Sequence, residues 1–218
     1  MNENITFETY FNSPIYLGEV KELINPLIKA TDKYINESKK RNIKVIKQRE
    51  KDFRKKIGDF GLSYHSTTLL NDNNFDTLKS YIDDRALEIF DHMGYDLTNY
   101  KIKWSEFWVQ EFAKNGGGNH EGHIHYNTHL SGFYFLKCSD RTSFPVFHDP
   151  RPAKLMSQLP LKNKEEITLG SEQIHFKIVP GALMLFPSFL EHQFVVDAGV
   201  DPFRFIHFNL TAVQNFIE

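Results

Sequence analysis

Cysteine is almost absent from this sequence, which has one, Cys138, among 218 residues. A disulfide framework and a thiolate-rich zinc site both need several sulfur atoms, so both are excluded. We interpret Cys138 as a small buried apolar residue of a strand rather than as a nucleophile. The chemistry of the chain must be sought in other residue types.

Long apolar runs are also lacking, since no stretch approaches the roughly 20 residues that cross a bilayer. The first residues, MNENITFETY, do not combine a basic stretch with an apolar one, and this pattern predicts no secretory signal. We therefore expect a cytoplasmic protein without membrane association.

Neither sign of charge dominates, and the formal net charge is −2. This gives no electrostatic reason to expect nucleic acid as a partner, although residues 39–56 are locally basic. We interpret that run as a solvated helix or loop. No heptad pattern indicates self-association, so a homodimer is expected only from the general frequency of dimers.

The first hundred residues carry helical patterns. Apolar residues recur at helical spacing from Val20 to Ile28, with a local distortion expected at Pro26. A clearer helix is predicted over 74–92, with Asn74 as its cap and Gly94 as its end. We expect one domain over 1–218, in which 1–100 form a mainly helical scaffold.

After Tyr100 the sequence changes to short runs rich in aromatic and β-branched residues, separated by Gly- and Pro-containing turns. Strands are predicted at 105–112, 122–126, 130–137, 144–148, 173–179, 182–186, 192–196 and 203–210. Residues 151–171 are predicted to form a long loop of the kind that often covers a site. The predicted class is mainly β with N-terminal helices (α+β), with 101–218 as a closed or double-sheet core.

Histidines gather in one segment, because four of the chain's ten fall between positions 120 and 129. His123 and His125 are two residues apart, so on a strand both imidazoles project from one face and can bind the same ion. Two neutral imidazoles suit iron, zinc, copper or nickel, so this pair alone does not choose the metal.

A third histidine and an arginine follow in the same half of the chain. The run GALMLFPSFLEH is an apolar strand that breaks at Pro187 and delivers His192 just after the turn. Arg204 opens the last predicted strand among apolar neighbours, where a buried guanidinium needs an anionic partner such as a carboxylate.

Together these motifs resemble the iron(II)- and 2-oxoglutarate-dependent oxygenases. The segments HIHYNTHLSGFYFL, FHDPRP, PGALMLFPSFLEH and RFIHFNL are similar to a bacterial and phage-type group of that family. The resemblance implies a double-stranded β-helix, the jelly-roll fold that cupins share, with Fe(II), 2-oxoglutarate and O2 at its site. It implies His123, His125 and His192 as metal ligands, Arg204 as the partner of 2-oxoglutarate, and Ser131 as a further contact.

The sequence departs from the family at His125, where most members have Asp or Glu. An alternative set keeps a carboxylate by using Glu121 with His123 and His192, since Glu121 shares the strand face of His123. His120 and His129 are interpreted as neighbours of the site or surface residues, and His207 and the remaining histidines as structural.

The function that the resemblance implies is hydroxylation of an unidentified substrate, coupled to decarboxylation of 2-oxoglutarate to succinate. One alternative is a cupin-like three-histidine iron dioxygenase that does not use 2-oxoglutarate. Another is a non-enzymatic jelly-roll module that binds a metal or a ligand, because fold alone does not decide function.

Overall fold

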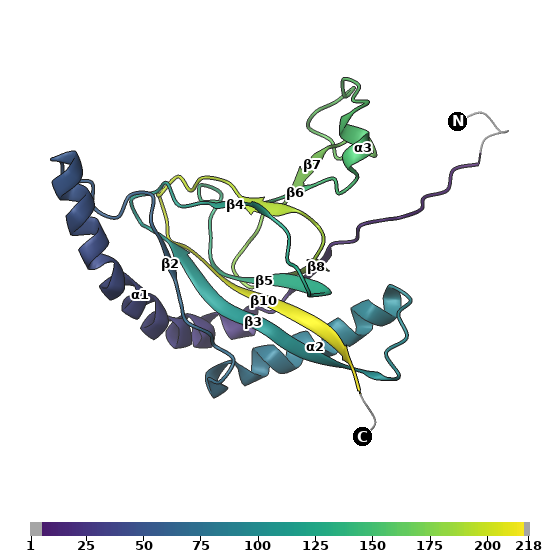
Figure 1. Cartoon of the computed structure of the whole chain (residues 1–218), viewed down its shortest axis with the longest axis horizontal. Helices are drawn as coiled ribbons and strands as arrows, with labels where there is room; N and C mark the ends of the chain where they lie inside the picture. Colours follow the sequence, from purple (N-terminus) through teal and green to yellow (C-terminus); the bar gives the residue numbers. More distant parts are fainter. Residues whose placement is uncertain (1–5, 216–218) are drawn as a thin grey trace.

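The computed structural model describes residues 6–215, whose strands form two antiparallel sheets that face each other (Figure 1). The six-stranded sheet consists, in spatial order, of β1 (Tyr16–Glu19), β8 (Ala182–Pro187), β5 (Leu130–Lys137), β10 (Phe203–Gln214), β3 (Tyr100–Phe112) and β2 (Ser63–His65). The four-stranded sheet consists of β4 (His120–His123), β9 (His192–Phe194), β6 (Pro145–His148) and β7 (Gln173–His175).

The two long helices lie on the outer face of the six-stranded sheet (Figure 1). They are α1 (Ile24–Phe53) and α2 (Asp76–His92), each preceded by a 3-10 turn, η1 (Lys21–Leu23) and η2 (Asn73–Phe75). The short α3 (Pro152–Leu155) lies apart from them, near β6 and β7 (Figure 1). The expected mainly β class with N-terminal helices is confirmed.

The helix ends differ from the prediction at two positions. Pro26 lies in the first turn of α1 and does not distort it, because amides there have no partner within the helix. Asn74 is not a cap but lies within η2, the 3-10 turn before α2. Asp72 caps that turn by accepting a hydrogen bond from the Asn74 amide at 3.0 Å, and α2 itself has no side-chain cap. Gly94 follows α2 with a positive φ of 81°, as predicted for a helix end.

All eight strands predicted after Tyr100 are present, with shifted ends. β4 ends at His123, so His125 lies in the turn after it rather than on the expected strand. The N-terminal half also contributes more than helices, because β1 and β2 pair with β8 and β3 at opposite edges of the six-stranded sheet. Residues 151–171 contain α3 and turns, and they project beyond β6 and β7 (Figure 1).

Two apolar cores result from this layering. One lies between the helices and the six-stranded sheet, and it includes Phe75, Ile82, Phe107 and Phe208. The other lies between the two sheets and is dominated by phenylalanine. Its fully buried aromatic members are Phe112, Phe133, Phe135, Phe147, Phe186, Phe194, Phe203 and Phe205.

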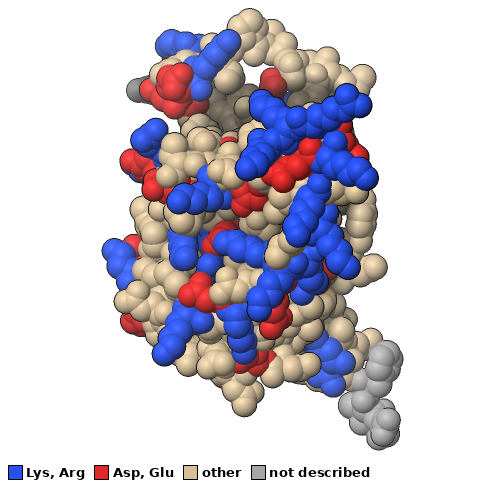
Figure 2. All heavy atoms as spheres, turned by 90° about the vertical axis from the view of Figure 1, so that its left-hand side faces the viewer, with Lys and Arg blue, Asp and Glu red and all other residues tan. Residues whose placement is uncertain are grey.

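The basic run 39–56 forms the second half of α1 and the turn after it, as the expected solvated helix. Lys and Arg side chains gather on this side of the molecule, interspersed with Asp and Glu (Figure 2). Among the described residues, no helix is long and apolar enough to cross a membrane.

Candidate metal centre

Three histidines converge where the two sheets meet. His123 ends β4 and pairs directly with His192, the first residue of β9. His125 reaches them from the turn after β4. The backbone amide of His125 donates a hydrogen bond to the Ser188 carbonyl at 3.0 Å, which fixes this turn. One ring nitrogen of each histidine lies within 4.8 Å of one from each of the others. The structure therefore brings the three predicted ligands together.

The ring orientations of this histidine triad suit metal binding. Nδ1 of His123 faces the Glu121 carbonyl at 2.7 Å, and Nδ1 of His192 faces the Leu190 carbonyl at 2.9 Å. A carbonyl only accepts, so each Nδ1 carries the proton and each Nε2 keeps its lone pair. Nε2 of His192 and Nε2 of His125 are buried without a partner among the described residues.

Burial keeps His125 and His192 uncharged. Burial, with a smaller contribution from the neighbouring histidines, lowers the pKa of His125 to about 3 and that of His192 to about 2. The ring of His120 lies 4.4 Å from that of His123, and burial lowers its pKa to about 4. Neutral imidazoles are the form that binds metal, so the cluster is ready for a cation at neutral pH.

His207 belongs to the same cluster, and its interpretation as a structural residue apart from the site was wrong. Its ring stacks on that of His125 at 4.7 Å, and its carboxylate neighbour is Glu106 of β3. Ligand atoms of Glu106, His125 and His207 lie within 4.8 Å of one another. The sequence did contain an indication of this position, because residues two apart on a strand share a face, which places His207 and Asn209 on the same face of β10.

Arg204 points to the opposite face of β10. Its Nε and Nη2 contact the Glu111 carboxylate at 2.7 and 2.6 Å, and its Nη1 contacts Asp32 of α1 at 2.7 Å. Because adjacent strand residues face opposite ways, Phe203 and Phe205 occupy the inner face instead. The buried charge has the anionic partners that it needs, but they are protein carboxylates on the helix side, so the assignment of Arg204 to 2-oxoglutarate does not fit this structure.

Ser131 does face the site. It lies opposite Asn209 on β10 and is completely buried. Its hydroxyl contacts Ser188 at 2.8 Å and donates to Asn209, and the Asn209 amide lies 3.0 Å from Nδ1 of His125. A neutral polar group of Ser131, Ser188 and Asn209 thus adjoins the histidine triad.

The side chain of Glu121 is exposed, and it joins no group of converging ligands among the described residues. The three-histidine set is therefore the better supported of the two predicted sets. His129 has a structural role, because its Nδ1 accepts a hydrogen bond from the Ala212 amide at 3.2 Å.

Residues 106–209 match the model of a family described as "Putative 2OG-Fe(II) oxygenase". The resemblance to the 2OG-Fe(II) oxygenases is confirmed. Those residues extend from Glu106 to Asn209 and include every ligand candidate described above. No curated protein matches the chain.

Solved structures of this family are similar in fold. A Pseudomonas putida prolyl-4-hydroxylase is 9% identical over 90% of this chain and 92% of its own, with a TM-score of 0.51. A Burkholderia pseudomallei oxidoreductase of the 2OG-Fe(II) oxygenase family is 12% identical over 68% of each chain, with a TM-score of 0.48. A Trichoplax adhaerens prolyl hydroxylase, solved with a peptide fragment of hypoxia inducible factor, is 13% identical over 69% of this chain and 64% of its own, with a TM-score of 0.44. At such identities the likeness is one of fold, and the expected double-stranded β-helix is confirmed.

The 2OG-Fe(II) oxygenase family implies Fe(II), 2-oxoglutarate and O2 at the site. The unpartnered Nε2 atoms of His125 and His192 fit a metal ion, since buried polar atoms without partners are rare in folded proteins. For 2-oxoglutarate the described inner faces offer hydroxyl and amide groups, while the only buried Lys or Arg among the described residues is Arg204. A carboxylate of the cosubstrate would thus meet neutral donors.

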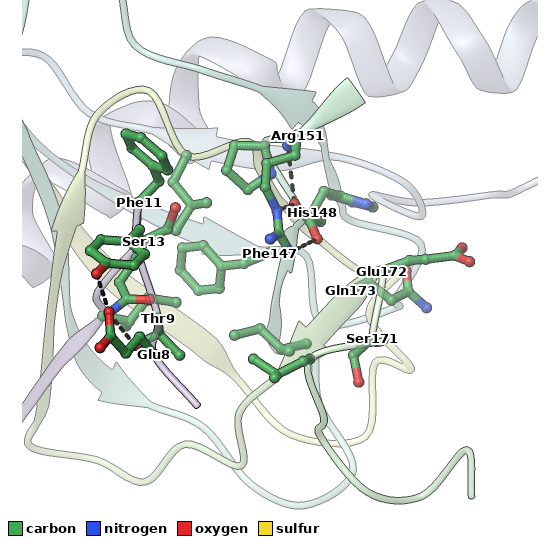
Figure 3. Close-up of a pocket in the computed structure, with 18 of the residues that line it drawn as sticks. Glu8, Thr9, Phe11, Ser13, Phe147, His148, Arg151, Ser171, Glu172 and Gln173 are labelled. Carbon is green, nitrogen blue, oxygen red and sulfur yellow. Dashed lines mark hydrogen bonds and ion pairs between the residues drawn. The ribbon is translucent and has the colours of Figure 1, made fainter. Parts of the chain in front are cut away.

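A pocket of about 380 Å³ lies beside this centre. Figure 3 shows it between the segment around Phe11 and the end of β6, with Phe147 and His148 on its wall. The Phe147 ring also packs against the His192 ring, with the centroids 5.8 Å apart. Arg151 also lines the pocket and forms a salt bridge with Asp149 at 2.7 Å. Phe147 is thus shared between the pocket wall and the surroundings of His192.

Proposed function

We propose that this chain is an Fe(II)- and 2-oxoglutarate-dependent hydroxylase whose iron is held by His123, His125 and His192. The observation that carries the proposal is the convergence of three imidazoles whose Nδ1 atoms have other partners. In a family of this chemistry such a group holds a metal and leaves further coordination positions for cosubstrate and oxygen. When bound, iron and 2-oxoglutarate supply the oxidant that hydroxylates a C–H bond, as the cosubstrate is converted to succinate and CO2.

The protein's part is to orient the ligands and exclude water. The carbonyls of Glu121 and Leu190 fix the rings of His123 and His192, which sets the direction of each Nε2 lone pair. Packing of Phe133, Phe147 and Phe186 around His192 keeps the surroundings apolar. An apolar surround protects a reactive oxidant from water and side reactions.

Ser131 and Ser188 are proposed to hold 2-oxoglutarate. Their hydroxyls adjoin His125 through Asn209, and both can donate to a carboxylate. Without a guanidinium the contact lacks a charge-assisted hydrogen bond, which is roughly twice as strong as a neutral one. The proposed site therefore binds 2-oxoglutarate less tightly than an arginine clamp would.

The pocket beside Phe147 is proposed to take the substrate. Phe147 of its wall also packs against the His192 ring, and its lining combines this aromatic residue with the ion pair of Asp149 and Arg151. Such a mixture of an apolar wall and a few polar groups is typical of small-molecule and side-chain sites. The identity of the substrate is left to screening.

The test is an anaerobic titration of metal-free protein with Fe(II) and then 2-oxoglutarate, followed by visible spectroscopy. A charge-transfer band of chelated keto acid, and succinate release once O2 is admitted, are expected in the wild type. His192→Ala should lose the band. Iron binding without a band would overturn the use of 2-oxoglutarate and favour the three-histidine dioxygenase or the binding module.

A further inference from the structure

His207 is a buried histidine without a hydrogen-bond partner. Its side chain is 1% exposed, and neither ring nitrogen has a hydrogen-bond partner among the described residues. The ring packs against two aromatic neighbours, with centroids 4.5 Å away at Trp108 and 4.7 Å away at His125. Burying two polar atoms without hydrogen-bond partners costs free energy of folding. A bound ligand that pairs with the His207 ring would remove this cost.

The groups that could share such a ligand are Glu106 and His125. The nearest carboxylate oxygen of Glu106 lies 3.5 Å from Nε2 of His207, and the Glu106 side chain is 49% exposed. One ring nitrogen of His125, whose Nε2 has no partner among the described residues, completes a group of two imidazoles and one carboxylate with ligand atoms within 4.8 Å of one another.

Asn209 couples this second group to the histidine triad. Its amide nitrogen lies 2.9 Å from Glu106 and 3.0 Å from Nδ1 of His125. In this orientation the amide donates to Nδ1, which leaves the His125 proton on Nε2. Metal binding at Nε2 needs the reversed amide, whose oxygen would accept from Nδ1 and repel the Glu106 carboxylate. Binding through His125 therefore releases Glu106 to pair with a cation.

We propose that Glu106, His125 and His207 form a second metal position beside the three-histidine position. The two positions share His125, whose ring has a single unpartnered nitrogen and can bind only one ion, so one ion binds at a time. Carboxylate ligands suit Mn(II), and imidazoles suit Zn(II). Mn(II) therefore occupies the carboxylate position and Zn(II) the three-histidine position. This inference does not depend on the use of 2-oxoglutarate.

A matched set of variants tests the two positions without any turnover. Mn(II) binding is followed by electron paramagnetic resonance of the free ion, and Zn(II) binding by competition with a chromophoric chelator. Glu106→Gln and His207→Phe should each weaken Mn(II) about tenfold or more and change Zn(II) by less than about threefold. His192→Phe should do the reverse, and His125→Ala should weaken both. Zn(II) binding that persists in the first two variants also shows that they are folded.

Glu121→Gln is the control, because it removes an exposed carboxylate from the same stretch of β4 and should change neither affinity. In the wild type, Zn(II) should displace Mn(II) with one ion bound at saturation. Unchanged Mn(II) affinity in Glu106→Gln and His207→Phe would overturn the second position. Simultaneous binding of both metals would also overturn the inference as stated. Neither result bears on the keto acid band that tests the proposed function.

Discussion

At the scale of single residues, the burial of the Arg204 charge was predictable from its neighbours in the sequence, but its partners were not. Its position in RFIHFNL predicts burial, and burial predicts an anionic partner. Both expectations agree with the structure, but the partners are Glu111 and Asp32. Apolar residues flank Arg204 on both sides, so the sequence could not tell which face of β10 it occupies. His207 was missed for the same reason.

Arg204→Met is expected to destabilise the fold without affecting the metal centre. Removing one member of a buried ion pair costs about 3–5 kcal/mol, because Glu111 is left with less compensation. Urea denaturation measures the loss, and the iron–keto acid band should persist in the folded fraction. The control is Arg85→Met, which breaks an exposed pair with Glu88 and should cost less than about 1 kcal/mol. A stable Arg204→Met protein without the band would restore the original assignment.

Ser131→Ala tests the proposed contact with 2-oxoglutarate. Loss of one neutral hydrogen bond to a carboxylate should weaken cosubstrate binding about tenfold, equivalent to about 1.4 kcal/mol. The anaerobic titration of the band against 2-oxoglutarate concentration gives the affinity. Ser143→Ala is a suitable control, because Ser143 is equally buried but bonds the Val195 carbonyl away from the histidines. Equal affinities in both variants would remove Ser131 from the site.

At the scale of elements, the turn after β4 decides the geometry of the triad. The expected strand would have carried His123 and His125 on one face, whereas the chain leaves β4 at His123 and brings His125 back toward Ser188. Asn127 in this turn has a φ of +58°, in the left-handed region that Asn tolerates better than most residues. Its carbonyl accepts a hydrogen bond from Thr211 of β10 at 3.1 Å. The sequence therefore indicates that His123 and His125 lie close together, but not that His125 lies in a turn rather than on the strand.

Asn127→Val should disturb this turn and weaken metal binding. A β-branched residue in the left-handed region costs roughly 1–2 kcal/mol, and the strain is relieved by moving His125. Thermal unfolding and Zn(II) affinity should both decrease. Asn127→Gly removes the same side chain without the backbone strain, so it should retain Zn(II) binding. If the two variants behave alike, the side chain of Asn127 matters rather than its backbone conformation.

At the scale of the whole molecule, the site is assembled from separate strands. His123, His192 and His207 come from β4, β9 and β10, and Glu106 comes from β3. The phenylalanine core holds the two sheets together, and the helices cover the outer face of the larger one. Uncharged histidines in such an interior make the stability of the metal-free fold depend on pH.

Stability of the metal-free protein should decrease as pH falls from about 6.5 toward 4. The unfolded chain has ordinary histidines that take up protons below about 6.5, whereas burial lowers the pKa of His120 to about 4 and of His125 to about 3 in the folded state. The unfolded state therefore binds more protons in this range, and stability rises with pH. Urea denaturation at several pH values measures the slope. His125→Phe should flatten it, and an unchanged slope in that variant would contradict this origin.

The sequence by itself determined the strand-rich half and the helical half, because periodicity is a local property, and its resemblance to a known family singled out His123, His125 and His192 as candidate ligands. Tertiary structure alone decided that Arg204 faces the helices, that Glu106 and His207 join His125, and that β1 and β2 complete the larger sheet. Those outcomes depend on which face of a strand turns inward and on the register between strands distant in the chain. Where a strand has apolar residues on both faces, as β10 does, only packing against its neighbours selects the face.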